Sequence, residues 1–203
     1  MVSVSYAVVG HHSRRDRAEK LAVKLDAALV MDEGDRGSLT NHDAAWVAAH
    51  TADADYVAVL EDDAEPISDF RYHVEQALDH LPGPGAVSCY LGTARPRQGA
   101  VAQALSLADD ASWLRSRSAW WGPALVLPAE HVRPMLMRVR HLHMPYDQRL
   151  SAYLRSVGLP CYYTLPSLVE HADGASLLRD CPLPRRAHRV GAPSGWNTRV
   201  VDF

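Results

Sequence analysis

The stretch YVAVLEDDAEPISDF, residues 56–70, holds three features in direct succession that decide the fold class. Its first part, residues 56–60, is an apolar run with the length and composition of a buried strand. The run stops at three consecutive acids, residues 61–63. Apolar residues then recur at helical spacing, which predicts a helix that begins at Ser68 or Asp69. A strand, a polar turn and a helix in this order are typical of α/β proteins.

The same alternation of strands and helices runs through the first half of the chain. Strands are predicted at residues 2–9, 28–31, 55–60 and 86–92, with helices at 14–27, 41–50 and 68–81 between them. Asn41 is predicted to cap the second of these helices. Strands that alternate with helices form mainly parallel sheets with helices on both faces. We therefore expect an α/β fold with a Rossmann-type mixed sheet flanked by helices.

The second half of the chain is less regular in pattern. A strand is predicted at residues 119–128, helices at 129–139 and about 144–158, and a last strand at 160–165, whereas residues 94–118 look irregular. The tail after Leu178 is rich in arginine and proline and is predicted to be largely irregular. We expect a single catalytic domain at residues 1–178 and a tail, residues 179–203, that packs on or near the site.

The bulk composition limits the class of protein. The chain has 203 residues, 47% of them hydrophobic and 22% charged, which is enough for one sizeable core. No apolar run has the length of a membrane span, and the N-terminus lacks the basic region of a signal peptide, so we expect a cytoplasmic protein. The three cysteines form no C-x-x-C pair, which argues against a disulfide framework or a zinc ribbon.

The charges of the chain are unevenly distributed. The net charge of −3 gives no global attraction to nucleic acid. Nineteen of the 21 basic residues are arginine, and five of these lie between Arg179 and Arg199 against a single acid, Asp180. Because arginine pairs with phosphate in bidentate geometry, Arg185 and Arg186 are candidates for phosphate contacts. The alternative is a solvated arginine-rich tail.

Polar clusters follow three of the predicted strands. They are GHHSRRD at 10–16, MDEGD at 31–35 and LEDD at 60–63. The carboxyl ends of parallel strands meet at one edge of a sheet, where α/β proteins bind ligands. We therefore expect the three clusters to line one cleft.

The first two clusters contain candidates for nucleotide binding. In the first cluster these are Gly10, His11, Arg14 and Arg15, which follow a strand and enter a helix, a place suited to phosphate. Asp32, at the end of the second strand, is a candidate to accept hydrogen bonds from a base or a ribose. Neither the dinucleotide fingerprint nor the P-loop sequence is present.

The third cluster suggests a metal site. Carboxylates two residues apart in an extended segment point the same way, so Glu61 and Asp63 are expected to face one ligand, with Asp62 turned elsewhere. Mg²⁺ or Mn²⁺ prefers carboxylates together with phosphate oxygens. The alternative is an acidic turn in which Glu65 and Asp69 stabilise the start of the next helix.

Two further residues in the second half have both a functional and an ordinary interpretation. His171 follows the last predicted strand and either completes the metal site or is a surface histidine. Asp147 lies at a predicted helix start and is either the cap of that helix or a general base near the cleft.

The order of these motifs resembles the GT-A class of nucleotide-sugar glycosyltransferases. After the acid cluster come a W-G-P-A strand at 121–124, a D-x-x-L-x-x-Y helix at 147–153 and the sequence P-S-L-V-x-H at 166–171. The segment VLEDDAEPISDF resembles the E-D-D segment of the family 25 lipopolysaccharide and collagen-type sugar transferases. It is also similar to the DxD-like segment of family 2. The resemblance covers about residues 2–178, and only 56–70 and 166–177 are close to motif level.

The resemblance implies a GT-A-like fold and a role for each matching residue. Asp63 and Glu61 would bind Mn²⁺ or Mg²⁺ together with His171, and Asp62 would lie near the donor sugar or ribose. The donor would be a nucleotide-diphosphate sugar, with a UDP-sugar as the first candidate.

The resemblance also places candidates on the acceptor side. Trp121 and Gly122 would border the donor sugar and the acceptor. Asp147 falls where inverting members place the catalytic base. The chain departs from the family pattern in two places, because its motif is E-D-D rather than D-x-D and because Tyr146, not an acid, precedes Asp147.

One hypothesis for the acceptor is a hydroxymethylated pyrimidine in DNA, modified by a phage-type enzyme; another is a surface glycan. The first is motivated by the arginine tail and by four basic residues near the expected acceptor side, Arg138, Arg140, His141 and His143. Two other function classes remain alternatives. A metal-dependent phosphohydrolase would use the His42-Asp43 pair or the histidines before Asp147, and a non-catalytic module would bind nucleotide sugar or nucleic acid without turnover.

Overall fold

The computed structural model describes residues 2–34, 36–93, 97–172 and 185–203. Its helices are α1 (Arg15–Leu25), α2 (Ser38–Ala49), α3 (Phe70–Asp79), α4 (Gln98–Leu105), α5 (Ala129–Val139) and α6 (Tyr146–Val157), with a 3-10 turn η1 (His12–Arg14). Its strands are β1 (Val4–His11), β2 (Ala28–Asp32), β3 (Tyr56–Glu61), β4 (Ala64–Pro66), β5 (Ala86–Ser88), β6 (Trp113–Ser116), β7 (Ala124–Pro128), β8 (Cys161–Thr164), β9 (Val169–His171) and β10 (Val200–Asp202).

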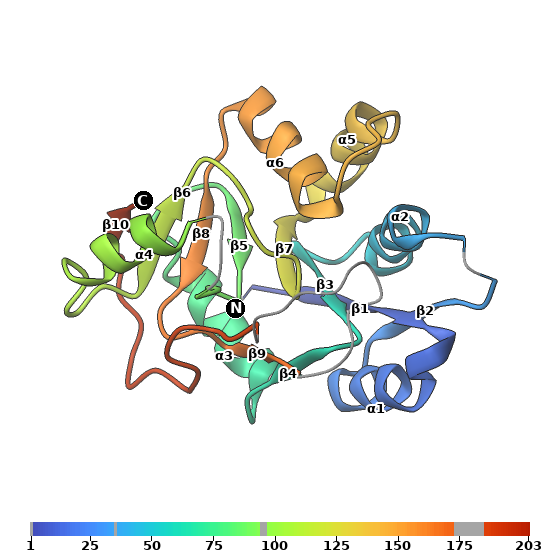
Figure 1. The fold of residues 1–203 in the computed structure, drawn as a ribbon, viewed down its shortest axis with the longest axis horizontal. Coiled ribbons are helices and arrows are strands. Elements are labelled where there is room, and N and C mark those ends of the chain that lie inside the picture. Colours follow the sequence, from blue (N-terminus) through green and yellow to red (C-terminus); the bar gives the residue numbers. More distant parts are fainter. Residues whose placement is uncertain (1, 35, 94–96, 173–184) are drawn as a thin grey trace.

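The centre of the molecule is an eight-stranded mixed sheet (Figure 1). The strand order is β10-β6-β8-β5-β7-β3-β1-β2. β1 pairs in parallel with both β2 and β3, as the alternating pattern predicts. β7 pairs antiparallel with β3 on one side and with β5 on the other, so the sheet is mixed. The predicted class, a mixed α/β sheet flanked by helices, is confirmed.

Helices cover both faces of this sheet, and β3 shows why. Its successive side chains point to opposite faces, so Val57 and Val59 enter one core while Ala58 and Leu60 enter the other. The first core is closed by α2, α4, α5 and α6 and the second by α1 and α3 (Figure 1). Burial on both faces explains why β3 is a continuous apolar run rather than an alternating one.

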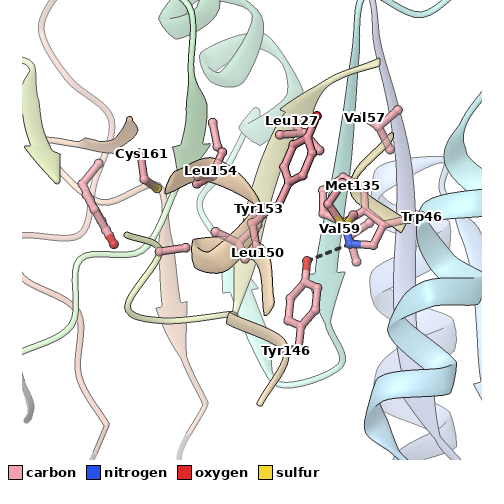
Figure 2. Packing of buried hydrophobic residues seen from close by; sticks show 14 of the residues in the cluster. Trp46, Val57, Val59, Leu127, Met135, Tyr146, Leu150, Tyr153, Leu154 and Cys161 are labelled. Carbon is pink, nitrogen blue, oxygen red and sulfur yellow. Dashed lines mark hydrogen bonds between the residues drawn. The ribbon is translucent and has the colours of Figure 1, made fainter. Parts of the chain in front are cut away.

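The packing of α6 against the sheet positions the start of that helix. Tyr146, Leu150, Tyr153 and Leu154 are buried along one face of α6 (Figure 2). The indole of Trp46 in α2 donates a hydrogen bond of 3.0 Å to the hydroxyl of Tyr146. This bond joins two helices that are far apart in the sequence and holds the first turn of α6 beside α2.

The predictions for several segments are wrong in extent. The strand predicted at 86–92 ends at Ser88, because Cys89 and Leu91 instead accept backbone bonds from residues 168, 169 and 188. The strand predicted at 119–128 begins only at Ala124. Residues 94–118, predicted to be irregular, contain α4 and β6. The described part of the tail is largely irregular, as predicted, except for β10, which pairs in parallel with β6.

The predicted cap of α2 is also wrong, and Asp147 is not the cap of α6, which was one of its two interpretations. α2 begins at Ser38, after Gly37 with a φ of 94°, so Asn41 lies inside the helix rather than at its start. The residue before α6 is Pro145, and Asp147 lies in the first turn of the helix. Within the part of the chain that the structure describes, no helix is both long and apolar enough to cross a membrane.

Candidate functional site

A cavity of about 230 Å³ lies where β1, β2 and β3 end. The three strands end at nearly the same level, because His11 is paired with Asp32 and Val9 with Glu61. The predicted candidates that line the cavity are Gly10, His11, Arg14, Asp32, Glu61, Asp62, Asp63 and Arg185. The expectation that the three polar clusters line one cleft is therefore confirmed.

Arg14 bridges two acids of the E-D-D segment. Its Nη1 donates to Oδ1 of Asp62 at 2.9 Å and to Oδ2 of Asp63 at 2.8 Å. Both carboxylates are buried, and the backbone N–H of His11 donates a further bond to Asp62 at 2.9 Å. Burial opposes the charge of Arg14, but its pairing with the two acids outweighs this and raises the pKa of the guanidinium.

His171 reaches Asp63 through a short second sheet. β4 and β9 pair antiparallel, with Ala64 opposite His171, and the backbone N–H of Ala172 donates to the carbonyl of Asp63 at 2.8 Å. The Nε2 atom of His171 lies 3.3 Å from Oδ2 of Asp63. Burial, followed by the charge of Glu61, raises the pKa of Asp63.

Glu61 faces a histidine as well. Its Oε1 lies 3.3 Å from Nε2 of His42, whose ring stacks on Tyr146 with a centroid separation of 3.9 Å. Burial alone would raise the pKa of Glu61, but the contact with His42 and the positive charges of the site outweigh it, so the pKa is lowered. Glu61 and Asp63 thus each lie beside a buried histidine.

The donor set near Asp63 fits a divalent cation. His171 Nδ1 lies 2.8 Å from the carbonyl of Ala172, so Nδ1 carries the proton and Nε2 carries a lone pair in the neutral ring. Among the described residues, this Nε2 and Oδ1 of Asp63 are buried without a hydrogen-bond partner. Nitrogen and carboxylate lone pairs of this kind are ligands for Mn²⁺. As the side chains lie, no group of three or more His, Cys, Asp or Glu residues in the described ranges is arranged to hold a metal.

Asp32 organises the loop that forms one wall of the cavity. Its Oδ1 accepts from the N–H of Arg36 at 2.9 Å and of Gly34 at 3.3 Å, and its Oδ2 accepts from the N–H of Gly37 at 3.0 Å. These backbone bonds, first among them that of Arg36, lower the pKa of Asp32. The carboxylate is buried, so it shapes the loop that precedes α2.

Three predicted residues, Trp121, Gly122 and Asp147, do not line the cavity. A Cβ on Gly122 would lie 2.9 Å from Oε1 of Glu61, so the backbone approaches that carboxylate closely. Trp121 packs edge-to-face against the rings of Tyr90 and Tyr163. Burial raises the pKa of Asp147 to about 6, and the charge of Glu61 contributes to the same effect.

Two of the predicted arginines, Arg15 and Arg186, do not line the cavity. Arg15 is exposed and pairs with Glu33 and with Glu19. Arg186 is also exposed, and its carbonyl accepts from the backbone N–H of Thr93 at 2.9 Å. Arg179 and the distal part of the 166–177 motif lie outside the described residues.

The sequence analysis missed the contribution of α2 to the cavity. Ser38, Asn41 and His42 line it, and Nδ2 of Asn41 donates to the carbonyls of Gly10 at 2.9 Å and of Val30 at 3.2 Å. These polar residues follow the second polar cluster directly in the sequence, and this position could have indicated that they line the cavity.

The structure argues against a phosphohydrolase centred on the His42-Asp43 pair. Asp43 is bound to Arg149 at 3.0 Å, whereas the free nitrogen of His42 faces Glu61. His141 and His143 are exposed in the loop before α6.

Comparison with known proteins identifies relatives by structure only. No protein-family model and no curated protein matches the chain. The crystal structure of A197 from STIV is similar with a TM-score of 0.50 and 14% identity over 86% of this chain and 87% of the other. Drosophila beta-1,4-galactosyltransferase 7, as a mutant in complex with manganese, UDP-Gal and xylobiose, has a TM-score of 0.51 and 13% identity over 86% of this chain and 72% of the other.

A third structure, a glycosyltransferase involved in glycosylation of the major capsid of PBCV-1, has a TM-score of only 0.33 and 8% identity and supports no argument. At these identities the similarity concerns the fold alone. The predicted GT-A-like mixed sheet flanked by helices is confirmed by it.

Proposed function

We propose that the chain is a metal-dependent glycosyltransferase that moves a sugar from a nucleotide-diphosphate sugar, in the first place a UDP-sugar, to an acceptor hydroxyl. The observation that carries the proposal is the cavity at the ends of β1, β2 and β3. The cavity combines arginines suited to a diphosphate with three consecutive acids. One of these acids, Asp63, faces Nε2 of His171, which has no hydrogen-bond partner within the described residues. The GT-A-like fold of the chain agrees with this function but does not establish it.

The acids of the cavity would hold the cation, and the arginines would hold the diphosphate. Asp63 and His171 are the proposed metal ligands, with Glu61 nearby and Asp62 on the side of the donor sugar or ribose. A divalent cation bound there supplies a Lewis acid that neutralises charge on a departing diphosphate. Arg14 and Arg185 both line the cavity and would contact the phosphate oxygens.

Asp147 is the proposed general base of an inverting transfer. It would take the proton of the acceptor hydroxyl while the hydroxyl oxygen attacks the anomeric carbon and the bond to the diphosphate breaks. A carboxylate with a pKa of about 6 is a stronger base than an ordinary aspartate and is still ionised at neutral pH. Gly122, whose backbone approaches Glu61, and Trp121, which precedes it, would border the donor sugar and the acceptor.

For the acceptor we propose DNA that carries a hydroxymethylated pyrimidine, with a surface glycan as the alternative. The loop that leads into Asp147 carries exposed His141 and His143, and Arg140 precedes them at the end of α5. Basic groups in the segment that leads to the proposed base suit a polyanionic acceptor. Gel shifts with DNA that weaken as salt rises would support this acceptor, and absence of DNA binding at low salt would exclude it.

A thermal-shift screen of nucleoside diphosphates and their sugars, with and without Mn²⁺, tests the proposed function. Because a ligand that binds only the folded state stabilises it by mass action, we expect a rise in melting temperature with UDP plus Mn²⁺ that exceeds the rise with either alone. Asp63→Asn should lose this rise and at least about 100-fold of the turnover while remaining folded.

Two outcomes would contradict the proposal. A non-catalytic binding module predicts that Asp63→Asn leaves the function of the chain intact. A phosphohydrolase predicts release of nucleotide products at full rate in the absence of any acceptor.

A further inference from the structure

The position of Arg14 has a consequence for the binding of a cation. One nitrogen of its guanidinium lies 2.9 Å from Oδ1 of Asp62 and 2.8 Å from Oδ2 of Asp63. A positive charge therefore already lies between the two acids of the E-D-D segment. The exposed fractions of the two carboxylate side chains are only 6% and 7%, so water screens this arrangement weakly.

The oxygen that Arg14 contacts on Asp63 is also the oxygen next to His171. Nε2 of His171 lies 3.3 Å from Oδ2 of Asp63, and its other ring nitrogen is committed to the carbonyl of Ala172. Arg14 thus bonds one oxygen of the same carboxylate that, with His171, offers ligands for a metal, whereas Oδ1 of Asp63 has no hydrogen-bond partner among the described residues.

A divalent cation and Arg14 compete for these oxygens. Divalent cations bind carboxylate oxygens at about 2.0–2.6 Å, which would place the ion inside the contact distance of the guanidinium. Two positive charges at such a separation in a buried site repel each other strongly. A cation on the carboxylate of Asp63 would therefore weaken the hold of Arg14, and the cavity that Arg14 lines would offer it the oxygens of a bound diphosphate.

We infer that Arg14 is an internal counter-ion of the cation site, which holds Asp62 and Asp63 until a diphosphate draws it away and frees Asp63 for the metal. The inference rests on the proposed function for the identity of the diphosphate ligand. It makes the binding of metal and the binding of nucleoside diphosphate depend on each other, because either ligand favours the state in which Arg14 has left Asp62 and Asp63. Such coupling is reciprocal, and about 5- to 150-fold is its usual size.

The test measures Mn²⁺ affinity directly, by calorimetry or by the electron paramagnetic resonance of free Mn²⁺, with and without UDP. The wild-type protein should bind Mn²⁺ at least about fivefold more tightly when UDP is present. Arg14→Gln should bind Mn²⁺ alone at least about fivefold more tightly than the wild type, and UDP should no longer strengthen its Mn²⁺ binding to the same degree.

Two variants serve as controls. Arg17→Gln removes a charge from the same helix, but Arg17 is exposed and lies 4.0 Å from Glu65, so its Mn²⁺ affinity should equal that of the wild type. Arg14→Lys keeps the positive charge, so its affinity for Mn²⁺ alone should stay close to that of the wild type. Melting temperatures in EDTA verify that Arg14→Gln is folded. If it is not, Arg14→Met, which keeps the length of the side chain without its charge, takes its place with the same expected result.

The outcomes separate the inference from the proposed function. Unchanged or weaker Mn²⁺ binding in folded Arg14→Gln, with normal binding of UDP plus Mn²⁺ by the wild type, would overturn the inference alone. Failure of the wild type to bind any nucleoside diphosphate would overturn the proposed function. In that case tighter Mn²⁺ binding by Arg14→Gln would still support the counter-ion role.

Discussion

At the scale of single residues, Asp147 shows how the fold changes the chemistry of a side chain. Burial at the start of α6 is the main reason why the pKa of Asp147 rises to about 6, and the nearby charge of Glu61 adds to it. Below this pH the side chain is protonated and unable to accept a proton from a hydroxyl. The same residue on an exposed helix start would be ionised throughout the physiological range.

Asp147 is therefore expected to set the acid limb of the pH profile. If it is the base, kcat/KM should fall as pH decreases through about 6, and Asp147→Asn should remove this limb together with most of the activity. The folded state holds the proton of Asp147 more tightly than the unfolded state, so stability is lost as pH rises from the unfolded pKa to about 6. Asp147→Asn should therefore melt at a higher temperature than the wild type at pH 8, but not at pH 3.5.

An unchanged pH profile in Asp147→Asn would exclude Asp147 as the base. A lower melting temperature at pH 8 would show instead that the carboxylate stabilises the start of α6.

At the scale of elements, the segment between β2 and α2 is held by one carboxylate. Asp32 accepts backbone bonds from Gly34, Arg36 and Gly37, and α2 begins directly after this turn. The turn and the first residues of α2 form one wall of the cavity. The wall therefore depends on a buried side chain that a bound nucleotide need not touch.

Asp32→Asn should loosen this wall. The amide of asparagine has one acceptor oxygen, and its NH₂ group would face backbone N–H groups that also donate. We therefore expect roughly tenfold weaker nucleotide binding and a lower melting temperature at pH 7. The pKa of Asp32 is lowered in the folded state, so its stabilisation is present above the unfolded pKa and is lost as pH falls below it. The difference in melting temperature should accordingly shrink below about pH 4.

Glu33→Gln is the matched control, because Glu33 is an exposed neighbour in the same turn. Equal effects of the two substitutions would contradict the role given to Asp32.

At the scale of the whole molecule, the C-terminus completes the edge of the sheet farthest from β2. β10 pairs in parallel with β6, and Asp202 binds the guanidinium of Arg115 at 2.6 and 2.9 Å. Phe203 packs edge-to-face on Tyr163 with a centroid separation of 5.1 Å. The cavity lies at the other end of the strand order, on β1, β2 and β3.

Removal of residues 200–203 should therefore affect stability more than binding. We expect the melting temperature to fall by about 2–8 °C, which corresponds to a loss of about one to two kcal/mol in a chain of this size. The affinity for UDP plus Mn²⁺ should change less than about twofold, because no residue of β10 lines the described cavity. Asp202→Asn weakens only the contact with Arg115 and should lower the melting temperature less. A large loss of affinity for UDP plus Mn²⁺ in the truncated chain would show instead that this edge of the sheet supports the site.

Much of the half of the sheet around β1 follows from the sequence by itself. The alternation of apolar runs with helical periodicity predicts β1, β2 and β3 and their parallel pairing, because these strands are joined by short local βαβ units. Parallel pairing brings the three polar clusters to one edge, so the location of the acid cluster in a cavity was also predictable. The roles proposed for its residues remain predictions.

Only the tertiary structure decided the arrangements that join distant parts of the chain. β7 enters between β3 and β5, β10 joins β6, and Trp46 binds Tyr146 across 100 residues. The pairing of Glu61 with His42 and the bridge of Arg14 to Asp62 and Asp63 belong to the same class. Local periodicity reports which face of an element is buried, whereas the choice of partner depends on packing between elements that no local pattern encodes.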